Sequence, residues 1–353
     1  MSLSTLAAAC FLAGLLNCSP RDAGSGPPAT IVPPPAAPNA VVRLAYGPAP
    51  AQFGDLRLPA SLAPAPVVLV LHGGCWQAAL TSLNHTAALA EALRREGYAT
   101  WNVEYRRLGE TGGGWPGTFQ DAGAALDFVR VLARRYPGRL DTARVVVVGH
   151  SAGGHLACWL AARPQLPRGW YAPATPGPTA SVPPAPPPFR PAGIVNLDGQ
   201  PDLRAFEEAG GLFCGGGIGA QLVGGDFQQQ PVRWRLASPV SFLPWRMPGR
   251  LLVGSDGMMT QRLSQDFLDR ARAAGDTATR LVILPATDHS ALVNPASGAW
   301  PVVRAAIRGL AGPECGGPAP PGTTPRHEGT YGLRVPSPTP APRFSDADSA
   351  QYR

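Results

Sequence analysis

Short apolar runs alternate with amphipathic segments along the middle of the chain. Each run is apolar at nearly every position and rich in Val, Leu or Ile, with little alternation between apolar and polar residues. Such strands are buried on both faces, as in a parallel sheet covered by helices on either side. The predicted strands are residues 67–71, 99–103, 144–148, 192–197, 250–253 and 280–284.

The segments between these runs carry apolar residues at helical spacing. Near the C-terminal end of the core, for example, Leu263, Phe267 and Ala271 share one helix face, and Gly275 follows as a typical helix end. The alternation predicts the α/β class, with a doubly wound, mostly parallel sheet and helices on both faces. Its ligand crevice should lie beyond the carboxyl ends of the strands. The predicted helices are residues 86–96, 121–135, 152–162 and 261–274.

Low-complexity segments border and interrupt this core in a chain of 353 residues with 42 Gly and 42 Pro. Residues 164–191 form a Pro-rich insertion, and residues 313–353 are predicted to be a disordered tail. Residues 1–18 form an uncharged leader whose apolar stretch, residues 6–16, is too short to span a bilayer as a helix, and residues 19–40 form a Pro-rich linker. One α/β domain is therefore predicted over residues 41–312.

The leader ends at Cys18. The residues before it, Leu15, Leu16 and Asn17, resemble the cleavage box of bacterial lipoproteins, although Asn17 stands where that family prefers Gly, Ala or Ser. This resemblance implies an exported protein, in the periplasm or at the cell surface, tethered to a membrane through Cys18. The leader lacks the positive charges of an export signal. A mis-assigned start codon or a buried N-terminal helix is the alternative, and the protein would then be cytoplasmic.

Charge gives little support for a nucleic-acid partner. The net charge is +7 and the 30 basic residues are all Arg, yet they are spread thinly through the chain. A nucleic-acid surface would concentrate them on one face. We therefore expect no nucleic-acid partner, and the sequence leaves the oligomeric state open.

A candidate nucleophile follows the predicted strand of residues 144–148. Gly149-His150-Ser151-Ala152-Gly153 is a G-x-S-x-G pentapeptide between a strand and a buried helix. A turn that sharp holds its serine in a strained conformation and needs small flanking residues, because neighbouring backbone crowds it. We expect Ser151 to project into the crevice as a nucleophile.

A serine hydroxyl needs a base, and the base needs a carboxylate that fixes its tautomer. His289 lies in the loop after the last predicted strand, which is where the base of this fold belongs. Asp256 directly follows the strand before it, which gives the chain order Ser, Asp, His expected of an α/β-hydrolase. Asp256 is therefore the predicted acid. Its rivals are Asp288, beside the base but expected to point away, and the two aspartates after an earlier strand, Asp198 and Asp202.

Acyl transfer also needs backbone N–H groups that face the developing oxyanion. The glycine-rich segment His72-Gly73-Gly74-Cys75-Trp76 follows the strand ending at Leu71. Its amides are expected to meet that of Ala152 in the crevice, because glycines allow the backbone to approach a substrate closely. A plain glycine-rich turn is the alternative.

These motifs resemble those of the kynurenine formamidase group, which is related to feruloyl and acetyl-xylan esterases and to the hormone-sensitive-lipase-like esterases. The resemblance implies a triad of Ser151, Asp256 and His289, and an oxyanion hole from the amides of Gly74, Cys75 and Ala152. Cys75 departs from the third Gly of the lipase-like version, and the loop after Val253 is a residue short. The motifs are HGGCW at 72–76, VEYRR at 103–107, WPGTFQDAGAALDFV at 115–129, GHSAGGHLACWLAAR at 149–163, LVGG at 222–225 and ASPV at 237–240.

The histidines and cysteines do not have the spacing of a metal site. No His-x-x-x-His or Cys-x-x-Cys spacing suggests a metal ion, and we expect no cofactor. Cys158 lies within the buried helix after Ser151 and is read as a small hydrophobic residue. Cys214 and Cys315 flank glycine-rich stretches and would be able to pair in an exported protein.

Together these features predict a serine hydrolase that cleaves short-chain carboxylic esters, a small-molecule substrate, through an acyl-enzyme. Long-chain lipids should be poor substrates because residues 202–225 are too short for a large lid. One alternative is arylformamidase activity on N-formylkynurenine, whose ring would stack on Trp76 or Trp115. Another is a non-catalytic surface protein that keeps the fold for binding.

Overall fold

The computed structural model describes residues 40–167 and 187–312. The leader with Cys18, most of the Pro-rich insertion and the tail with Cys315 lie outside the described residues, so the predictions made for them stay predictions. No helix in the described ranges is long and apolar enough to cross a membrane.

An eight-stranded sheet organises these residues, with strand order β1-β2-β4-β3-β5-β6-β7-β8. β2 pairs antiparallel with both β1 and β4, and the remaining strands run parallel. This order and the helical cover give an α/β-hydrolase fold, which confirms the predicted fold class. The strands are β1 (Val41–Ala45), β2 (Phe53–Arg57), β3 (Ala65–Leu71), β4 (Ala99–Val103), β5 (Leu140–His150), β6 (Gly193–Leu197), β7 (Gly249–Gly254) and β8 (Thr279–Ile283).

Helices cover both faces of the sheet, as the continuous apolar runs predicted. Alternate residues of a central strand face the two layers. Val68 and Val70 of β3 belong to the buried cluster that includes residues of α1 and α9, whereas Val67 and Leu69 belong to the cluster that includes residues of α2, α3, α4 and α8. The helices are α1 (Ala87–Arg95), α2 (Gly117–Asp127), α3 (Val129–Arg135), α4 (Ala152–Ala162), α5 (Leu203–Glu208), α6 (Ile218–Val223), α7 (Pro231–Ala237), α8 (Met258–Ala273) and α9 (Trp300–Ala311).

The elements differ in part from the sequence expectations, which did not include α5, α6, α7 or α9. The single helix predicted over residues 121–135 is two helices, α2 and α3, which meet at Phe128. The antiparallel strands β1 and β2 were not predicted, because β1 lies at the sheet edge with three of its five residues exposed and lacks the apolar run of a central strand.

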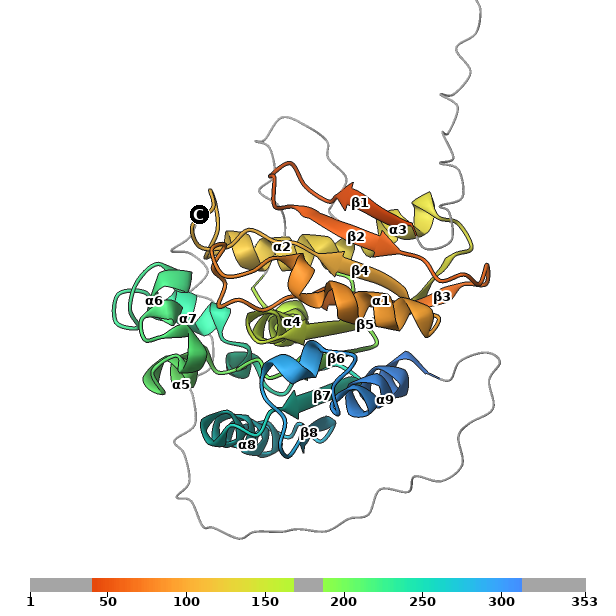
Figure 1. Ribbon diagram of the computed structural model, residues 1–353. Coiled ribbons are helices and arrows are strands. Elements are labelled where there is room, and N and C mark those ends of the chain that lie inside the picture. The colour runs from red at the N-terminus through yellow and green to blue at the C-terminus, as the bar shows by residue number, and fades with distance from the viewer. Residues whose placement is uncertain (1–39, 168–186, 313–353) are drawn as a thin grey trace, which may run out of the picture. The chain divides into compact units, whose positions relative to one another are not determined.

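A long connection between β6 and β7 positions the site. It contains α5, α6, α7 and two short 3₁₀ helices, η3 (Leu212–Cys214) and η4 (Pro239–Phe242). Figure 1 shows α5, α6 and α7 gathered beside one end of the sheet. The connection therefore covers the end at which the predicted site residues lie.

Candidate active site

Ser151 stands on a sharp turn between β5 and α4. Its φ of 54° and ψ of −120° place a non-glycine residue in a sparsely populated backbone region. The flanking glycines are required by packing: a Cβ at Gly149 would lie 2.0 Å from the Gly153 carbonyl oxygen, and one at Gly153 would lie 2.2 Å from the Leu71 carbonyl oxygen. The pentapeptide therefore forms the strained strand-to-helix turn that its sequence predicts.

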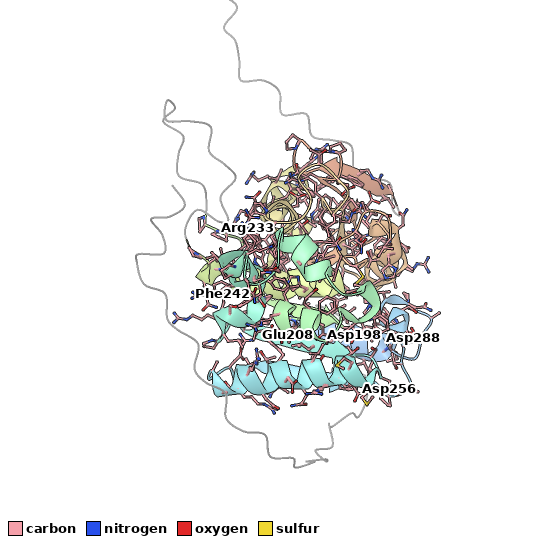
Figure 2. The ribbon with its side chains drawn as sticks, turned by 90° about the vertical axis from the view of Figure 1, so that its left-hand side faces the viewer. Asp198, Glu208, Arg233, Phe242, Asp256 and Asp288 are labelled. Atoms are coloured by element: carbon pink, nitrogen blue, oxygen red, sulfur yellow. A yellow bond between two sulfur atoms is a disulfide. The ribbon has the colours of Figure 1, made fainter. Side chains whose placement is uncertain are left out.

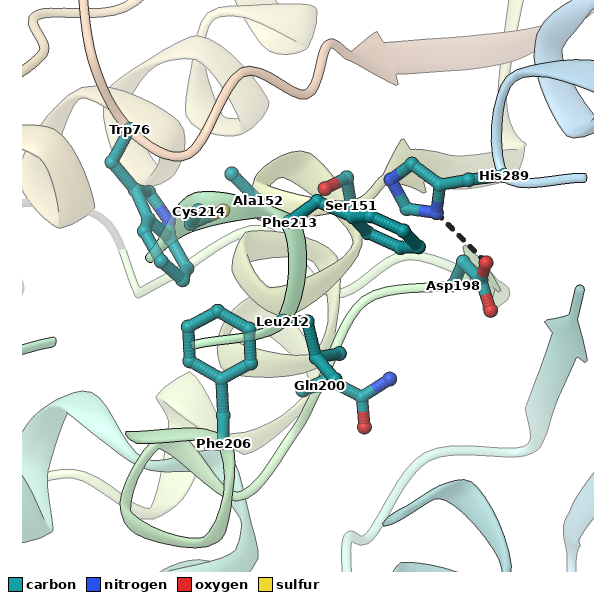
Figure 3. A pocket seen from close by; sticks show the side chains of 10 residues that line it. All are labelled: Trp76, Ser151, Ala152, Asp198, Gln200, Phe206, Leu212, Phe213, Cys214 and His289. Atoms are coloured by element: carbon teal, nitrogen blue, oxygen red, sulfur yellow. Dashed lines mark hydrogen bonds and ion pairs between the residues drawn. The ribbon is translucent and has the colours of Figure 1, made fainter. Parts of the chain in front are cut away.

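His289 lies in the loop after β8 and lines the same cavity as Ser151. Its Nδ1 is 2.8 Å from Asp198 Oδ2. Figure 3 shows the other ring nitrogen on the side that faces Ser151. Within the described residues no hydrogen bond joins Ser151 Oγ to this ring, and in ligand-free enzymes such contacts commonly tighten only when substrate binds.

Asp198 is the carboxylate that holds His289. It directly follows β6, has a φ of 59°, and its side chain is fully buried. Oδ1 accepts the Ser255 amide at 3.0 Å, and Oδ2 accepts the Ser255 hydroxyl in addition to His289 Nδ1. The Asp198 amide in turn donates to the Val253 carbonyl oxygen at 2.9 Å, so backbone and side chain are both fixed.

The prediction that Asp256 is the acid is corrected by this geometry. Asp256 is exposed, and its Oδ2 accepts the Ala286 amide at 2.8 Å while its Oδ1 accepts Gln261 Nε2 at 2.9 Å. In the short loop after β7, Ser255 turns inward onto Asp198, and the next residue turns outward. Figure 2 shows Asp256 near one end of α8, apart from Asp198.

The other two rival carboxylates have structural roles. Asp288 Oδ1 accepts the amides of Ser290 and Ala291 and the Ser290 hydroxyl, and these bonds hold the pKa of Asp288 below its usual range. Asp202 caps α5 by accepting the amides of Arg204 and Ala205. Asp198, the remaining alternative from the sequence, is the carboxylate that contacts His289.

The predicted oxyanion segment lies against the nucleophile. A Cβ added to Gly73 would come within 3.0 Å of Ser151 Cβ, so only a glycine lets this backbone approach so closely. The amides of Gly74 and Cys75 donate no hydrogen bond within the described residues. Ala152 is the first residue of α4, whose N–H has no partner inside the helix. These three amides thus have no hydrogen-bond acceptor among the described residues, and that of Ala152 directly follows Ser151.

Buried polar contacts fix the start of this segment. His72 is fully buried, with its Nε2 2.8 Å from Glu104 Oε1 and its carbonyl oxygen accepting the Tyr105 hydroxyl at 2.7 Å. The second Glu104 oxygen accepts the Leu83 amide at 3.0 Å. The segment therefore leaves β3 in a direction set by β4 and the loop after it.

A disulfide joins Cys75 to Cys214, with the two Cα atoms 5.5 Å apart. This excludes the pairing of Cys214 with Cys315, which the sequence left open. The partners are separated by 139 residues, and no local pattern marks them as a pair. Cys158 is a free buried thiol, as predicted, and burial raises its pKa.

The cavity beside Ser151 has a volume of about 20 Å³. That is room for little more than one water molecule or a methyl group. Trp76 lines this cavity, but Trp115, also predicted to bind substrate, is not among its residues and packs against Phe119 with ring centroids 5.0 Å apart. Figure 3 shows the lining, which comprises Trp76, Ser151, Ala152, Asp198, Gln200, Phe206, Leu212, Phe213, Cys214 and His289.

A larger open groove lies next to this cavity and shares His289 and Phe213 with it. Its volume is about 610 Å³. Phe213 is 70% exposed and its ring centroid lies 5.0 Å from that of His289, so it forms part of the boundary between the two spaces. The groove is lined by Phe213, Ser255, Asp256, Gly257, Ala286, Thr287, Asp288, His289 and Ser290.

Two further histidines, His150 and His85, lie behind the loop that carries His289. His150 Nε2 donates to the His289 carbonyl oxygen at 2.9 Å, so its Nδ1 accepts from His85 Nε2 at 3.1 Å. Burial lowers the pKa of His150 well below its usual value, and that of His85 is lowered for the same reason. The sequence placed His150 beside Ser151 but gave no sign of these contacts.

No group of three or more His, Cys, Asp or Glu side chains in the described part of the chain is arranged to hold a metal ion. The site brings together a serine, an imidazole and a buried carboxylate.

Two solved structures with similar folds are named as esterases. Esterase B from Lactobacillus Rhamnosis (HN001) is 21% identical with a TM-score of 0.61, and the alignment covers 78% of this chain and 87% of that one. A bacterial heroin esterase is 22% identical with a TM-score of 0.57, covering 77% and 83% of the two chains. These identities support a common fold.

A third similar structure belongs to a longer protein, the bifunctional GH43-CE protein of Bacteroides eggerthii. It is 21% identical with a TM-score of 0.59, and the alignment covers 76% of this chain but 37% of that one. The chain thus spans little more than a third of that protein.

No curated protein matches the chain. The model of the BD-FAE family, however, matches residues 55–267, which is more than half of the sequence and includes Ser151 and Asp198. The chain therefore belongs to the BD-FAE family, within the α/β-hydrolase esterase group that its sequence motifs resemble.

Proposed function

We propose that the protein is a serine hydrolase that cleaves esters of short carboxylic acids through an acyl-enzyme on Ser151. The observation that carries this proposal is the 2.8 Å contact between His289 Nδ1 and the fully buried Asp198 carboxylate. A carboxylate in that place holds the imidazole in the tautomer whose Nε2 can accept a proton. Ser151, on its strained turn, lines the same cavity.

The reaction follows from these positions. Ser151 Oγ attacks the ester carbonyl carbon while His289 Nε2 takes the hydroxyl proton. The carbonyl oxygen becomes an oxyanion, which accepts hydrogen bonds from the amides of Gly74, Cys75 and Ala152. Collapse of this intermediate breaks the bond to the alcohol oxygen, which leaves with the proton from His289. A water molecule then attacks the acyl-enzyme by the same steps and releases the acid.

The two spaces beside Ser151 suggest which part of the ester goes where. A cavity of about 20 Å³ accommodates the methyl group of an acetyl ester but not an extended alkyl chain. The open groove of about 610 Å³ on the other side of Phe213 has room for an alcohol of considerable size. We therefore assign the acyl group to the cavity and the alcohol to the groove.

Activity and labelling on one purified sample test the proposal. Nitrophenyl acetate should be hydrolysed with a higher kcat/KM than the octanoate, and a fluorophosphonate should label Ser151. Ser151→Ala should abolish both, whereas Ser241→Ala, which alters an exposed serine outside the cavity, should leave both unchanged. Equal labelling of the Ser151→Ala variant would rule out this nucleophile, and absence of all hydrolysis would favour a binding protein.

Formamide hydrolysis is the second candidate, because a formyl group is smaller than acetyl and also fits the 20 Å³ cavity. Amide cleavage requires protonation of the leaving nitrogen, whereas an alkoxide leaves more readily. We propose that acetate or butyrate esters exceed N-formylkynurenine in kcat/KM. The opposite ranking would identify the protein as an arylformamidase.

We also propose that the protein is exported and tethered through Cys18. The Cys75–Cys214 disulfide supports export, since such bonds persist mainly in oxidising compartments. Membrane fractionation of the native protein tests the tether, and Cys18→Ala should move the protein to the soluble fraction. A mature chain that still begins at Met1 would refute export by this route.

A further inference from the structure

A short glycine-bounded segment covers the cavity next to Ser151. We call residues 210–217 the cover segment; at its centre is η3, and Leu212, Phe213 and Cys214 all line the cavity. A Cβ added at Gly210, Gly215, Gly216 or Gly217 would meet no atom within 4 Å. These four glycines therefore face open space, whereas Gly211 is buried and a Cβ there would lie 2.2 Å from the Gly215 carbonyl oxygen.

Backbone hydrogen bonds hold the two ends of the cover segment. The Gly210 and Gly211 amides donate to the Glu207 and Phe206 carbonyl oxygens, and Glu207 accepts the Gly217 amide at the far end. Between them the Cys214 amide donates to Gly211, and the Phe213 ring lies against that of His289. The attachment at the centre is covalent, through the disulfide from Cys214 to Cys75. Phe213, between these anchors, remains 70% exposed.

The other end of the disulfide is the oxyanion segment. Cys75 and Trp76 have φ angles of 53° and 55°, so two consecutive residues with side chains occupy the left-handed region. Each such residue costs about 1 kcal/mol or more and persists only where its surroundings hold it. Trp76 also forms a wall of the cavity, where its ring meets Phe206 edge-on with centroids 5.9 Å apart. One disulfide thus connects two walls of the cavity and adjoins the oxyanion amides.

We propose that the Cys75–Cys214 disulfide determines acyl-chain specificity, by fixing the cover segment against the oxyanion segment so that the cavity admits only a short acyl group. This inference rests on the proposed function and names a determinant of its substrate range. When the bond is intact, an acyl chain longer than the cavity meets Leu212 and Cys214. When it is broken, the glycines allow the cover segment to move outward and make room.

The bond can be broken by reduction or by substitution. A dithiol reductant delivers two electrons and two protons to the disulfide, which yields two thiols while the reductant closes to its own cyclic disulfide. Cys214→Ser removes the bond permanently and leaves the backbone amide of Cys75 in place. We call the reduced protein and the Cys214→Ser variant the open forms. Because they lack the disulfide for different chemical reasons, a change that they share is due to loss of the bond.

The experiment measures kcat/KM for nitrophenyl acetate, butyrate, hexanoate and octanoate. Four preparations are compared: the oxidised protein, the protein reduced with dithiothreitol, Cys214→Ser, and Cys158→Ser as the matched control at a free buried thiol outside the cavity. Both open forms should raise the ratio of hexanoate to acetate by about tenfold or more, since each methylene that a pocket admits or rejects changes specificity by about that factor. Cys158→Ser should keep the oxidised ratio and respond to reductant as the parent does.

A chain-length ratio that stays within twofold of the oxidised value in both open forms overturns the inference, even if overall activity falls. A uniform loss of activity or loss of the folded circular-dichroism spectrum in both open forms shows that the bond serves stability alone, and that outcome also overturns it. The proposed function fails separately, when the oxidised protein neither hydrolyses nitrophenyl acetate nor reacts with a fluorophosphonate.

Discussion

The turn at Ser151 and the cover segment are both rich in glycine, but for different reasons. At the turn, a Cβ on Gly149 or Gly153 would lie within 2.2 Å of a backbone oxygen. In the cover segment, a Cβ on Gly215 or Gly216 would meet nothing within 4 Å. Glycine allows close packing in the first region, whereas most glycines of the second face open space and only Gly211 packs against backbone. Ser151 thus lies in the tightly packed region, and part of the cavity boundary lies in the more open one.

The largest effect is expected at the buried carboxylate. Asp198→Asn removes the charge that orients His289 and should lower kcat for nitrophenyl acetate by about 10³- to 10⁴-fold, as loss of a triad acid does. Asp256→Asn is the matched control: it alters an exposed carboxylate bonded to Ala286 and should change kcat by less than about threefold. If Asp256→Asn is the more damaging change, the acid assigned from the structure is wrong.

The two glycine environments predict opposite responses to an added methyl group. Gly149→Ala forces a Cβ against the Gly153 carbonyl and should lower the free energy of unfolding by about 3 kcal/mol or more. Gly216→Ala enters open space and should change it by less than about 0.5 kcal/mol. Neither position has the positive φ that would add backbone strain. Urea unfolding followed by circular dichroism measures both, and similar losses at the two sites would refute the contrast.

Acid should destabilise the packed region through its histidines. Burial lowers the pKa of His155 to about 4, and its Nδ1 has no hydrogen-bond partner in the described residues. Between pH 6.5 and 4 the unfolded chain binds a proton that the folded chain does not, so stability falls as the pH falls through this range. The lowered pKa of His150 acts in the same direction.

For His155 alone, the lowered pKa corresponds to about 3 kcal/mol in the free energy of unfolding. This stability is fully present above pH 6.5 and is lost as the pH falls towards 4. Urea unfolding at pH 7 and pH 4.5 measures the loss. His155→Gln keeps a donor for the Ala237 carbonyl but cannot titrate, so its stability should depend less on pH over this range. An equal dependence in the variant and the parent would show that His155 is not the source.

Much of the fold and part of the candidate site were predictable from local sequence. Six of the eight strands were predicted because they are short, apolar and covered on both faces, whereas β1 at the sheet edge lacks that pattern. Ser151 and His289 were located because each lies in the segment that follows an apolar strand, and parallel strands bring their carboxyl ends together. The edge hairpin and the helices of the β6–β7 connection carry weaker periodicity and were missed.

The carboxylate that contacts His289 and the cysteines that pair could not be predicted from local sequence. Asp198 and Asp256 both follow strands that end at the same edge of the sheet, so spacing alone favours neither. The choice depends on which side chain turns inward, and Ser255 occupies the inward position after β7 and donates to Asp198. Cys75 and Cys214 meet only because the connection after β6 folds back over the oxyanion segment.

The sequence by itself determined the α/β class, the strained turn at Ser151 and the loop that carries His289, because these depend on hydrophobic periodicity and on steric limits that act between near neighbours. Only the tertiary structure decided which carboxylate faces His289, which cysteines pair and how large the cavity is. Those features depend on side-chain direction and on contacts between segments up to 139 residues apart, which no local pattern records.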